Sequence, residues 1–495
     1  MTNRPVKRVV IAGGGTAGWL AAAALGRQLG ALVEIVLIES EEIGTIGVGE
    51  STVPTTRTFH SIAGIDEREF VRDNQASFKL GISFENWARP GDRYFHSFGT
   101  LGRATWMADF QHFWLEAAAQ GLESGIGEYC LEHQAGIAGR FTGGEDGPLN
   151  YAYHLDASRY ARFLRRLSEA AGVKRVEGRI ERVEQHGESG FVEALVLASG
   201  ERIAGDLFLD CTGFRSLLLG GTMGVPFDDW SHWLPTDSAL PAQTRSVGPA
   251  VPYTRAIAHD AGWQWRIPLQ HRVGNGFVYA SAFLKDEDRA REAFHTGLEG
   301  EILIEPRLIR FKAGARTRTW EKNVFALGLS GSFIEPLEST AIHLIQVAVT
   351  RLMQSFPFDG CHPAAIERYN RRTRGELENI RDFIILHYHQ TEREDSEFWR
   401  YVRHMPIPDS LAERIALFAE GAEAWQGQDE LFRVDSWVQV MLGQRLRPRS
   451  HNHVARMMPQ GQLRAALDGL KANVGRTVAA LPPHQQYLDA LCAGD

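Results

Sequence analysis

Three glycines in the spacing Gly13-x-Gly15-x-x-Gly18 follow directly on the short apolar run Val9–Ala12. In a strand–turn–helix unit, the first glycine of such a triplet permits the tight turn and the second lets the backbone approach a pyrophosphate. The third lets helix and strand pack closely. The start of the following helix presents free N–H groups and a positive dipole to phosphate groups. The triplet therefore predicts a dinucleotide-binding turn or, as the plainer alternative, a structural turn between strand and helix.

The residues after the triplet favour nucleotide binding. Helix-forming residues continue to Leu29, and a second apolar run, Val33–Ile38, ends in Glu39. A carboxylate at that strand end can accept hydrogen bonds from the ribose hydroxyls of a nucleotide. We find no second strand–GxGxxG–helix unit, although self-sufficient flavoprotein reductases commonly have two. We therefore expect a bound flavin that receives its electrons from another protein.

Length and charge narrow the function classes. The 495 residues exceed the roughly 250–300 at which one hydrophobic core stops growing, so we expect a composite core with an added region. Lys and Arg number 53 against 61 Asp and Glu, which gives a formal net charge of −8. A dedicated nucleic-acid binder shows a strongly basic face, so we expect no nucleic-acid partner.

Cysteine spacing and apolar runs indicate the compartment. The cysteines form no C-x-x-C pair, so we expect no metal site and no redox dithiol, and sparse cysteine use fits a reducing cytoplasm. The N-terminus lacks the pattern of a signal peptide, and no apolar run reaches the roughly 20 residues of a membrane span. We expect a cytoplasmic protein with no membrane partner. The cysteines are Cys130, Cys211, Cys361 and Cys492.

Two further segments have both a structural and a functional interpretation. Gly47–Pro54, with the sequence GVGESTVP, is either a loop over the sheet edge or a loop against the ring or ribityl chain of a flavin. We favour the second, because the segment closely follows the strand that ends in Glu39. Trp263 and Trp265 alternate with polar residues at strand spacing and share one strand face. Such a pair is more commonly part of a core than the wall of a cofactor site.

Five segments together resemble the flavin-dependent halogenases of the tryptophan halogenase type. The resemblance extends from near the N-terminus to Phe398 and Trp399, and the paired tryptophans and the PLEST segment are its most specific parts. The segments are GGGTAGW (Gly13–Trp19), GVGEST (Gly47–Thr52), SFKLGISFENW (Ser77–Trp87), GWQWRIP (Gly262–Pro268) and FIEPLEST (Phe333–Thr340).

The resemblance implies an enzyme that uses FAD as FADH2, O2 and a halide ion, bromide or chloride, to halogenate an electron-rich aromatic compound. A separate NAD(P)H-dependent flavin reductase supplies the reduced flavin. Hypohalous acid forms near the flavin and passes through a tunnel to a lysine, while a glutamate assists at the ring. In this sequence the lysine is Lys79 and the glutamate is Glu338, with Ser339 beside it.

The resemblance also implies binding residues. The halide is held by backbone N–H groups at Thr340 and Ala341. His96 and Phe98 match the aromatic wall that sandwiches an indole, and Trp263 and Trp265 become flavin-side tryptophans that keep substrate away from the flavin. The implied FAD contacts are Gly13, Gly15, Thr16, Ala17, Gly18, Glu39, Ser51, Val183, Leu329 and Ile342.

The same resemblance, with the alternation of apolar and helix-forming runs, predicts an α/β fold. We expect an FAD-binding doubly wound core interleaved with a sheet-containing substrate layer, and a helical C-terminal cap. The core is expected over 1–345, with substrate-layer insertions at about 85–150 and 225–310, and 346–495 as a mainly helical region that covers the substrate. Strands are predicted at Arg175–Val183, Val192–Ala198, Leu207–Leu209 and Val324–Leu329, and helices at Ala157–Ala171, Ala341–Ser355 and Pro363–Tyr388.

The catalytic residues also have direct interpretations. Lys79 lies in the alternating stretch Ser77–Phe84, where an isolated lysine is ordinarily a solvated strand residue. If it is buried, desolvation lowers the pKa of its ammonium group and makes the neutral amine accessible. Glu338 precedes a predicted helix, so N-capping is its plainer role. A carboxylate beside a cationic ring intermediate would stabilise that cation and accept the ring proton.

Two departures from the family pattern bear on substrate and halide. Ala341 stands where the family commonly has glycine, which makes the halide pocket tighter or differently shaped; we expect a bias toward bromide. Tryptophan-specific members have adjacent tyrosines that help to clamp the amino-acid backbone, and the stretch Asp435–Leu442 lacks them. We therefore expect an indole derivative rather than free tryptophan.

Two alternatives remain at this stage. The first is a flavin-dependent aromatic monooxygenase, although such hydroxylases usually have Gly-Asp where this chain has Gly328 and Leu329. The second is a non-catalytic flavin-binding module, which would not need Lys79 and Glu338 together. The sequence does not identify the natural substrate, whether it is bound to a carrier, the reductase, or whether the chain forms a homodimer.

Overall fold

The computed structural model describes residues 4–42, 49–122 and 124–493. The chain divides into two compact units, each assembled from three separate segments. The first unit comprises the chain up to Ala76 together with Leu155–Asp237 and Arg310–Glu378. The second comprises Ser77–His154, Ser238–Ile309 and the chain from Asn379 onward.

A sheet of buried, mostly parallel strands organises the first unit. Its order is β21-β22-β12-β1-β2-β8, and β1 lies between β2 and β12, both parallel to it. Apolar residues dominate the central strands, as expected when helices and other layers cover both faces of a sheet. The strands are β1 (Arg8–Ala12), β2 (Glu34–Glu39), β8 (Lys174–Glu177), β12 (Leu207–Asp210), β21 (Trp320–Glu321) and β22 (Val324–Ala326).

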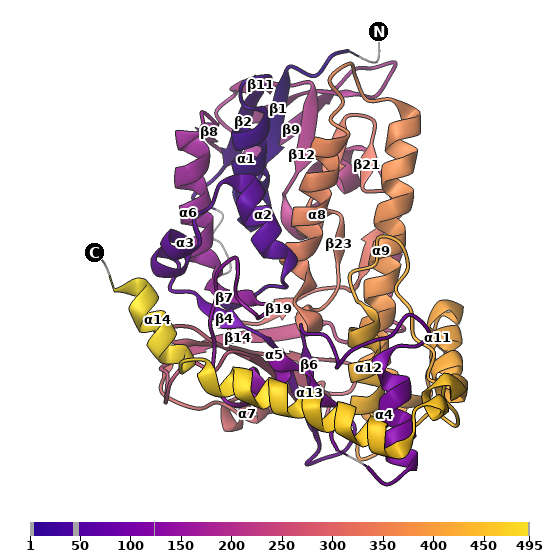
Figure 1. Ribbon diagram of the computed structural model, residues 1–495. Helices are drawn as coiled ribbons and strands as arrows, with labels where there is room; N and C mark the ends of the chain where they lie inside the picture. The colour runs from indigo at the N-terminus through magenta and orange to yellow at the C-terminus, as the bar shows by residue number, and fades with distance from the viewer. Residues whose placement is uncertain (1–3, 43–48, 123, 494–495) are drawn as a thin grey trace. The chain divides into compact units, whose positions relative to one another are not determined.

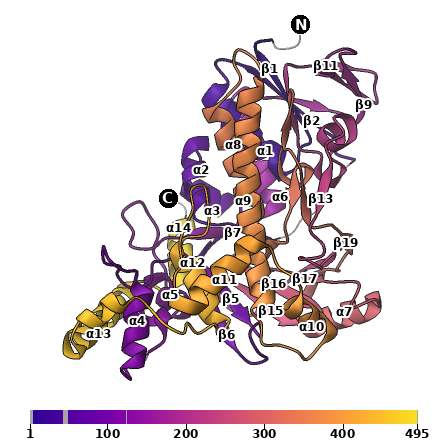
Figure 2. The ribbon, with the colours of Figure 1, turned by 90° about the vertical axis from the view of Figure 1, so that its right-hand side faces the viewer.

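Helices pack beside this sheet. The alanine-rich helix α1 (Thr16–Leu29) contacts α2 (Thr55–Ala63), α6 (Ala157–Ala170) and α8 (Thr340–Gln354), as Figures 1 and 2 show. Short elements complete the unit: α3 (Glu67–Asp73), β3 (Gly49–Ser51), the antiparallel sheet of β9 (Ile180–Gln185), β10 (Val192–Leu197) and β11 (Arg202–Ala204), and the sheet of β13 (Phe227–Asp229), β20 (Gly314–Arg316) and β23 (Ser332–Phe333).

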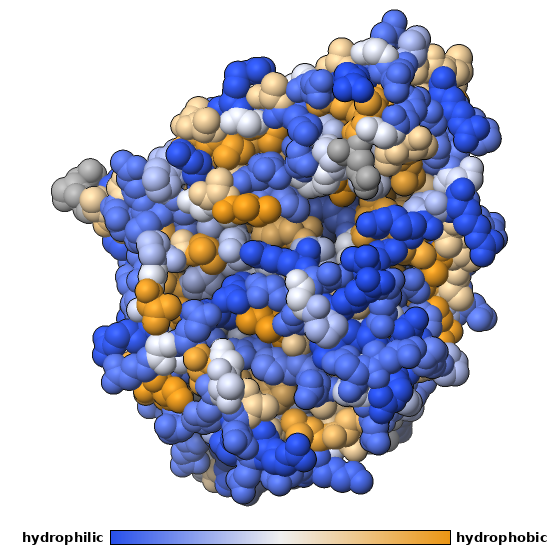
Figure 3. Space-filling view, turned by 90° about the horizontal axis from the view of Figure 1, so that it is seen from below, coloured by the Kyte–Doolittle hydropathy of each residue, from blue (hydrophilic) through white to orange (hydrophobic). Residues whose placement is uncertain are grey.

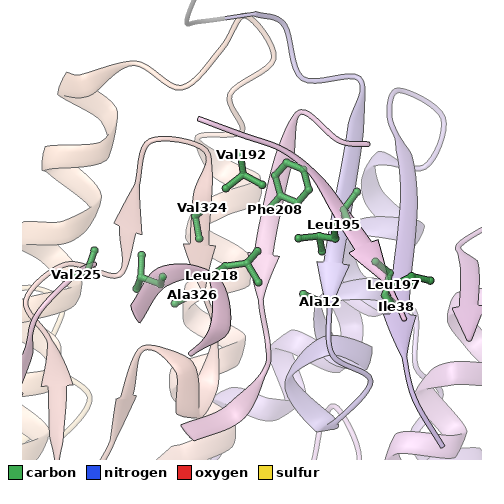
Figure 4. Close-up of a cluster of buried hydrophobic side chains, with 12 residues drawn as sticks. Ala12, Ile38, Val192, Leu195, Leu197, Phe208, Leu218, Val225, Val324 and Ala326 are labelled. Atoms are coloured by element: carbon green, nitrogen blue, oxygen red, sulfur yellow. The ribbon is translucent and has the colours of Figure 1, made fainter. Parts of the chain in front are cut away.

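One face of the parallel sheet and the sheet of β9–β11 share a hydrophobic core. Figure 4 shows Leu195 and Leu197 beside Phe208, Ala12 and Ile38, all of them buried. Leu218, from a π-helical turn at Leu217–Thr222 (η3), belongs to the same cluster. The core therefore fixes the carboxyl ends of β1, β2 and β12, where ligands bind in open parallel sheets.

A broad, mainly antiparallel sheet organises the second unit. Its order is β18-β14-β17-β16-β15-β5-β6, with β19 paired to β14. A further pair joins β4 (Ser77–Lys79) to β7 (Ala152–Asp156). The sheet strands are β5 (Gly81–Glu85), β6 (Arg93–Ser97), β14 (Ser238–Thr244), β15 (Thr254–His259), β16 (Gly262–Pro268), β17 (Val273–Tyr279), β18 (Ile302–Ile304) and β19 (Ile309–Arg310).

Helices make up most of the chain after residue 346. The long helix α13 (Gln460–Ala480) contacts α4 (Phe110–Ala119) and α5 (Leu131–Ile137), and α13 and α4 lie side by side in Figure 2. The division between the units falls within α9. The remaining helices are α7 (Glu287–Thr296), α9 (Pro363–His389), α10 (Glu397–His404), α11 (Asp409–Gly421), α12 (Val434–Gly443) and α14 (His484–Cys492).

The mixed α/β architecture confirms the predicted fold class, with two local corrections. The single strand predicted at Arg175–Val183 is wrong: β8 ends at Glu177, the Gly178 N–H donates to the Glu39 carbonyl, and β9 belongs to another sheet. The strand predicted at Val324–Leu329 ends at Ala326 and is followed by a 3-10 turn. The domain boundary at 345 stays a prediction; α8 continues through that residue.

Hydrophilic residues dominate the face seen in Figure 3, with hydrophobic residues scattered among them. Within the described residues, no helix combines the length and apolar character that a membrane crossing requires. No disulfide joins any of the four cysteines in the described part of the chain. Burial raises the pKa of Cys130 and of Cys361 to about 12, and that of Cys211 well above its ordinary value.

Buried histidines make stability depend on pH. Burial lowers the pKa of His60 to about 3 and that of His484 to about 4, below the ordinary 6.5. The unfolded chain therefore takes up protons first, and each pKa unit of difference is worth about 1.4 kcal/mol. We predict that the free energy of unfolding is highest above pH 6.5 and falls as pH drops toward 4. Urea denaturation at pH 7.5, 6 and 5 measures it, and His60→Gln should reduce the slope; a flat profile would contradict the prediction.

Candidate active site

The turn after β1 leaves no room for a side chain at Gly13, Gly14 or Gly18. Gly13 has φ +113°, and its N–H donates to the Ile38 carbonyl at 2.8 Å. A Cβ atom on Gly18 would lie 1.9 Å from the Gly13 carbonyl oxygen. Helix α1 can therefore approach β1 this closely only because position 18 is glycine.

Gly15 has the opposite surroundings. It precedes α1 with an extended backbone, and no atom lies within 4 Å of where its Cβ would be. Thr16 and Ala17 in the first helical turn are half-buried. The first N–H groups of an α-helix have no partner within the helix. An open, glycine-lined helix N-terminus is a fitting site for the pyrophosphate of a dinucleotide.

Glu39 ends β2 where the sequence predicts a ribose ligand. Its carboxylate accepts a hydrogen bond from Trp19 Nε1 at 3.2 Å and pairs with Arg175 and, at 3.4 Å, with Arg165. An ionised carboxylate offers about four acceptor positions, so capacity remains for a ribose hydroxyl. The two arginines lie more than a hundred residues away in sequence, and no local pattern indicates them.

Two further turns lie at the same end of the sheet. A Cβ on Gly13 would lie 2.4 Å from the Cys211 carbonyl oxygen, so the turn after β12 borders the glycine turn. Asp210 holds that turn, because its buried carboxylate accepts N–H bonds from Leu218 and Leu219 at 2.9 and 2.8 Å. A Cβ on Gly328 would lie 3.2 Å from the Ala17 Cβ.

The remaining predicted flavin contacts differ in exposure. Leu329, next to Gly328, is 38% exposed, whereas Ile342 in α8 is buried. Val183 lies on β9, pairs with Leu195 of β10, and packs, partly buried, against the hydrophobic core. Ser51 is buried on β3.

The segment GVGESTVP is partly outside the described residues, which omit Gly47 and Val48. Gly49–Ser51 form the short strand β3, so the predicted loop is wrong there, whereas Thr52–Pro54 belong to no strand or helix. Burial raises the pKa of Glu50 on this strand to about 7, a titratable group that we did not predict. Thr55 Oγ1 lies 2.8 Å from His343 Nδ1, which ties the start of α2 to α8.

The start of α8 places the predicted halide residues. Glu338 ends a 3-10 turn and is buried; Ser339 follows with φ +60°. Ser339, not Glu338, occupies the N-cap position, so the capping role considered for Glu338 is wrong. Thr340 is fully buried, its Oγ1 has no hydrogen-bond partner among the described residues, and Ala341 follows it in the first turn. Unpaired donors at a helix start suit a small anion.

Lys79 is the last residue of β4, and its side chain is completely buried. Its Nζ lies 5.1 Å from the centroid of the Phe98 ring, within the range of a cation–π contact. The predicted continuous strand Ser77–Phe84 is interrupted at Leu80: β4 pairs with β7, and β5 pairs with β6 and β15. A solvated strand lysine, the plainer interpretation, is excluded.

A buried histidine that we did not predict lies beside Lys79. Ser77 Oγ donates to the Pro268 carbonyl at 2.6 Å, so it accepts from His154 Nδ1–H at 3.1 Å. His154 Nε2 then accepts from the Thr254 hydroxyl at 2.9 Å. Burial, and after it the charge of Lys79, hold the pKa of His154 well below its ordinary value, so this ring is neutral.

An aromatic wall accompanies Lys79 in the second unit. His96 on β6 is buried, with its ring 5.5 Å from Phe383 and 6.2 Å from Phe432. Phe383 and Phe432 stack on each other at 3.7 Å. The sequence indicated His96 and Phe98, but Phe383 and Phe432 come from α9 and from a loop, where no motif marks them.

The stretch Asp435–Leu442 lies in helix α12. Gln439 fixes it to β6, because its Oε1 accepts from the Ser97 N–H at 2.9 Å and from the Ser97 hydroxyl at 2.8 Å. Asp435 accepts from the Leu101 N–H at 2.8 Å, and Arg433 Nη2 donates to the Phe98 carbonyl at 3.0 Å. Both charged side chains are thus bonded to the backbone around Phe98.

The paired tryptophans lie on β16. Trp263 is almost fully buried and contacts Trp87 and Trp265, with ring centroids 6.4 and 6.1 Å away. Trp265 is also buried, and within the described part of the chain its Nε1 has no hydrogen-bond partner. Trp263 therefore belongs to an aromatic core, as is common for tryptophans on a buried strand. A flavin-side role of the pair stays a prediction.

No group of three or more His, Cys, Asp or Glu side chains in the described part of the chain could hold a metal ion. His387, near the end of α9, instead bonds through Nδ1 to the Tyr94 hydroxyl at 2.7 Å and stacks on Phe84.

Comparison with known proteins agrees with these features. The family model described as tryptophan halogenase matches residues 8–460. The chain belongs to the tryptophan halogenase family. Tryptophan 7-halogenase RebH from Lentzea aerocolonigenes is 36% identical over 441 residues, which covers 84% of this chain and 82% of that protein.

Two solved halogenase structures extend the similarity over nearly the whole chain. The flavin-dependent halogenase Xcc4156 from Xanthomonas campestris has a TM-score of 0.97 and 53% identity, covering 99% of both chains. BrvH, a flavin-dependent halogenase from Brevundimonas sp. BAL3, has a TM-score of 0.94 and 40% identity, covering 98% of this chain and 99% of that one. The chain is therefore a flavin-dependent halogenase, which is an enzyme. The two alternatives, an aromatic monooxygenase and a non-catalytic flavin-binding module, are set aside.

We call the turn Gly13–Gly18 the glycine cradle. Two of its glycines, Gly15 and Gly18, give a matched test. We predict that Gly15→Val abolishes FAD binding without lowering Tm, because the added methyl groups fill open space at the α1 N-terminus. Gly18→Ala should lower Tm, because its Cβ meets the Gly13 carbonyl. Flavin titration by fluorescence and thermal melting separate the two effects. Tight FAD binding by Gly15→Val would contradict the assignment of the cradle.

Proposed function

We propose that this enzyme halogenates an indole derivative rather than free tryptophan, with Lys79 directing the halogen and Glu338 taking up the ring proton. The observation that supports this most is Lys79 itself. A lysine with no solvent exposure is rare, because burying an ammonium group is costly. It lies over the ring of Phe98, in a unit whose other aromatic side chains can accept a flat substrate.

The cofactor proposal rests on the glycine cradle. FAD would lie with its pyrophosphate at Gly13–Ala17 and its ribose at Glu39; when reduced, it supplies with O2 the oxidising power that converts halide to hypohalous acid. Because we find only one nucleotide-binding motif, a separate NAD(P)H-dependent flavin reductase would provide the reduced form. Thr340 and Ala341 would hold the halide through backbone N–H groups, and the Thr340 hydroxyl adds a buried donor.

Lys79 would act as a hydrogen-bond donor to hypohalous acid. Donation to the oxygen weakens the O–X bond and makes the halogen more electrophilic. The interaction is strong because the surroundings are dry. His154 adds no positive charge, since its ring is neutral.

Glu338 would stabilise the cationic ring and accept its proton. A positioned base contributes roughly 10²–10⁴-fold to such a step. Its burial and the left-handed backbone of Ser339 fix its position before α8.

The preference against free tryptophan rests on α12. An amino-acid zwitterion needs an anionic and a cationic partner, and burying it unpaired costs several kcal/mol. Asp435, which begins this stretch, and Arg433, two residues before it, are both bonded to backbone groups around Phe98. An indole without the amino-acid group has no such requirement and keeps the stacking on aromatic side chains.

Lys79→Met keeps a buried unbranched side chain and removes the donor. We predict that it abolishes halogenated product while FADH2 oxidation continues, because the lysine acts after hypohalous acid forms. Product is measured by mass spectrometry and flavin oxidation by absorbance. Thermal melting provides the folding control. Product at near wild-type rate would remove Lys79 from the mechanism.

The substrate proposal is tested by competition. Equal concentrations of indole and tryptophan are supplied with FAD, a flavin reductase, NADH and either bromide or chloride. We predict more haloindole than halotryptophan, and more product in bromide, which is the easier anion to oxidise. Tryptophan ahead by tenfold would contradict the interpretation of α12, and chloride ahead of bromide would contradict that of Ala341. Product from neither compound, nor from a panel of electron-rich arenes, would contradict the proposed function.

A further inference from the structure

The strand that bears Lys79 has one unpaired edge. Among the described strands, β4 pairs with β7 alone, through the register Phe78↔Tyr153 and Lys79↔Ala152. The backbone N–H groups of Phe78 and Leu80, on either side of Lys79, bond elsewhere. Leu80 N–H donates to the Pro252 carbonyl at 2.8 Å.

The N–H of Phe78 finds a different partner. It donates to Nε2 of His484 at 3.2 Å, and the other ring nitrogen of His484 bonds to the Ala250 carbonyl at 2.6 Å. A carbonyl can only accept, so Nδ1 has the proton and Nε2 is the acceptor. The imidazole therefore bridges two backbone groups that do not meet directly. Burial lowers the pKa of His484 to about 4, which keeps this neutral tautomer at neutral pH.

The segment before His484 is itself bonded to another part of the second unit, residues 139–141. Phe141 N–H donates to the Pro482 carbonyl at 3.1 Å, and His484 N–H donates to the Gly139 carbonyl at 2.9 Å. Arg140 also donates to the Leu481 carbonyl. The chain from Leu481 to His484, which leads into α14, is thus bonded to residues 139–141.

Aromatic packing fixes the imidazole further. Phe78 stacks on Phe141 with centroids 4.1 Å apart, and the His484 ring meets both edge-on at 6.1 and 5.7 Å. Tyr487, one turn further along α14, packs against the same two phenylalanines. The side chain of Phe78, the residue before Lys79 on β4, is thereby held in place by α14.

We propose that His484 is a positioning residue for Lys79, and that the C-terminal segment beyond residue 480 completes the lysine strand. This segment lies after residue 460, where the match to the family model ends. The inference rests on the proposed role of Lys79. His484 touches no reacting group; it holds the backbone of the residue before the lysine.

Three variants separate positioning from general stability. His484→Ala removes the bridge, and His484→Gln keeps one donor and one acceptor. Leu488→Ala, also buried on α14, weakens the docking of the helix but retains the imidazole. For each, halogenated product is measured per FADH2 oxidised, together with hydrogen–deuterium exchange of peptides that cover 77–84.

We expect His484→Ala to lower the product per FADH2 by about tenfold to a hundredfold, the cost of a small misplacement at a reacting group. FADH2 oxidation should keep its rate, and exchange in 77–84 should accelerate. His484→Gln should recover most of the coupling. Leu488→Ala should lower Tm yet keep wild-type coupling.

Wild-type coupling in His484→Ala, or an equal fall in Leu488→Ala, would overturn the positioning role. Wild-type enzyme that makes no product would instead contradict the proposed function. In that case exchange decides the structural claim: unchanged exchange in 77–84 of His484→Ala would refute it.

Discussion

The complete burial of Lys79 is the constraint on which the arrangement of the second unit around β4 depends. An ammonium group without solvent needs compensation, and it lies against the Phe98 ring, while the nearby histidine stays neutral. Ser77, on the same strand, is bonded on two sides, to Pro268 and to His154. The strand is therefore fixed at its backbone and at the side chains next to the lysine. A residue so placed cannot move to solvent without breaking these bonds.

In the proposed function, the first unit meets a different requirement, which is to hold two negatively charged ligands at helix starts. α1 begins at an open glycine turn, and α8 begins at a buried threonine hydroxyl. The two helices contact each other, and α8 is anchored at its other end by a buried pair between Arg351 and Glu376 at 2.6 Å. A rigid α8 gives its first turn a defined place, as a small-anion site requires.

Local patterns predicted the parts of this enzyme that depend on neighbours in sequence. The bounds of α1, α6 and α8 were predicted within a residue or two, because the spacing of glycines and helix-forming residues determines them. The strand at Arg175–Val183 was wrong, since Gly178 bonds back to Glu39 and redirects the chain.

Residues that act through long-range contacts could not be predicted in this way. His484 is 406 positions from Phe78, and Arg175 is 136 positions from Glu39. Their roles depend on which segments the fold brings together, and no spacing rule encodes that. Lys79 and Glu338 were assigned through a family resemblance; their burial, which makes the roles chemically plausible, appears only in the structure.

The hypohalous acid of the proposed function would also attack sulfur, so the cysteines and methionines of the protein are targets for it. Thiolates react with electrophilic halogen far faster than thiols do. Burial keeps Cys130, Cys211 and Cys361 protonated at neutral pH. Met457, which is 77% exposed, has no such protection by burial. The working lifetime of the protein therefore depends on how little oxidant escapes before it meets its substrate.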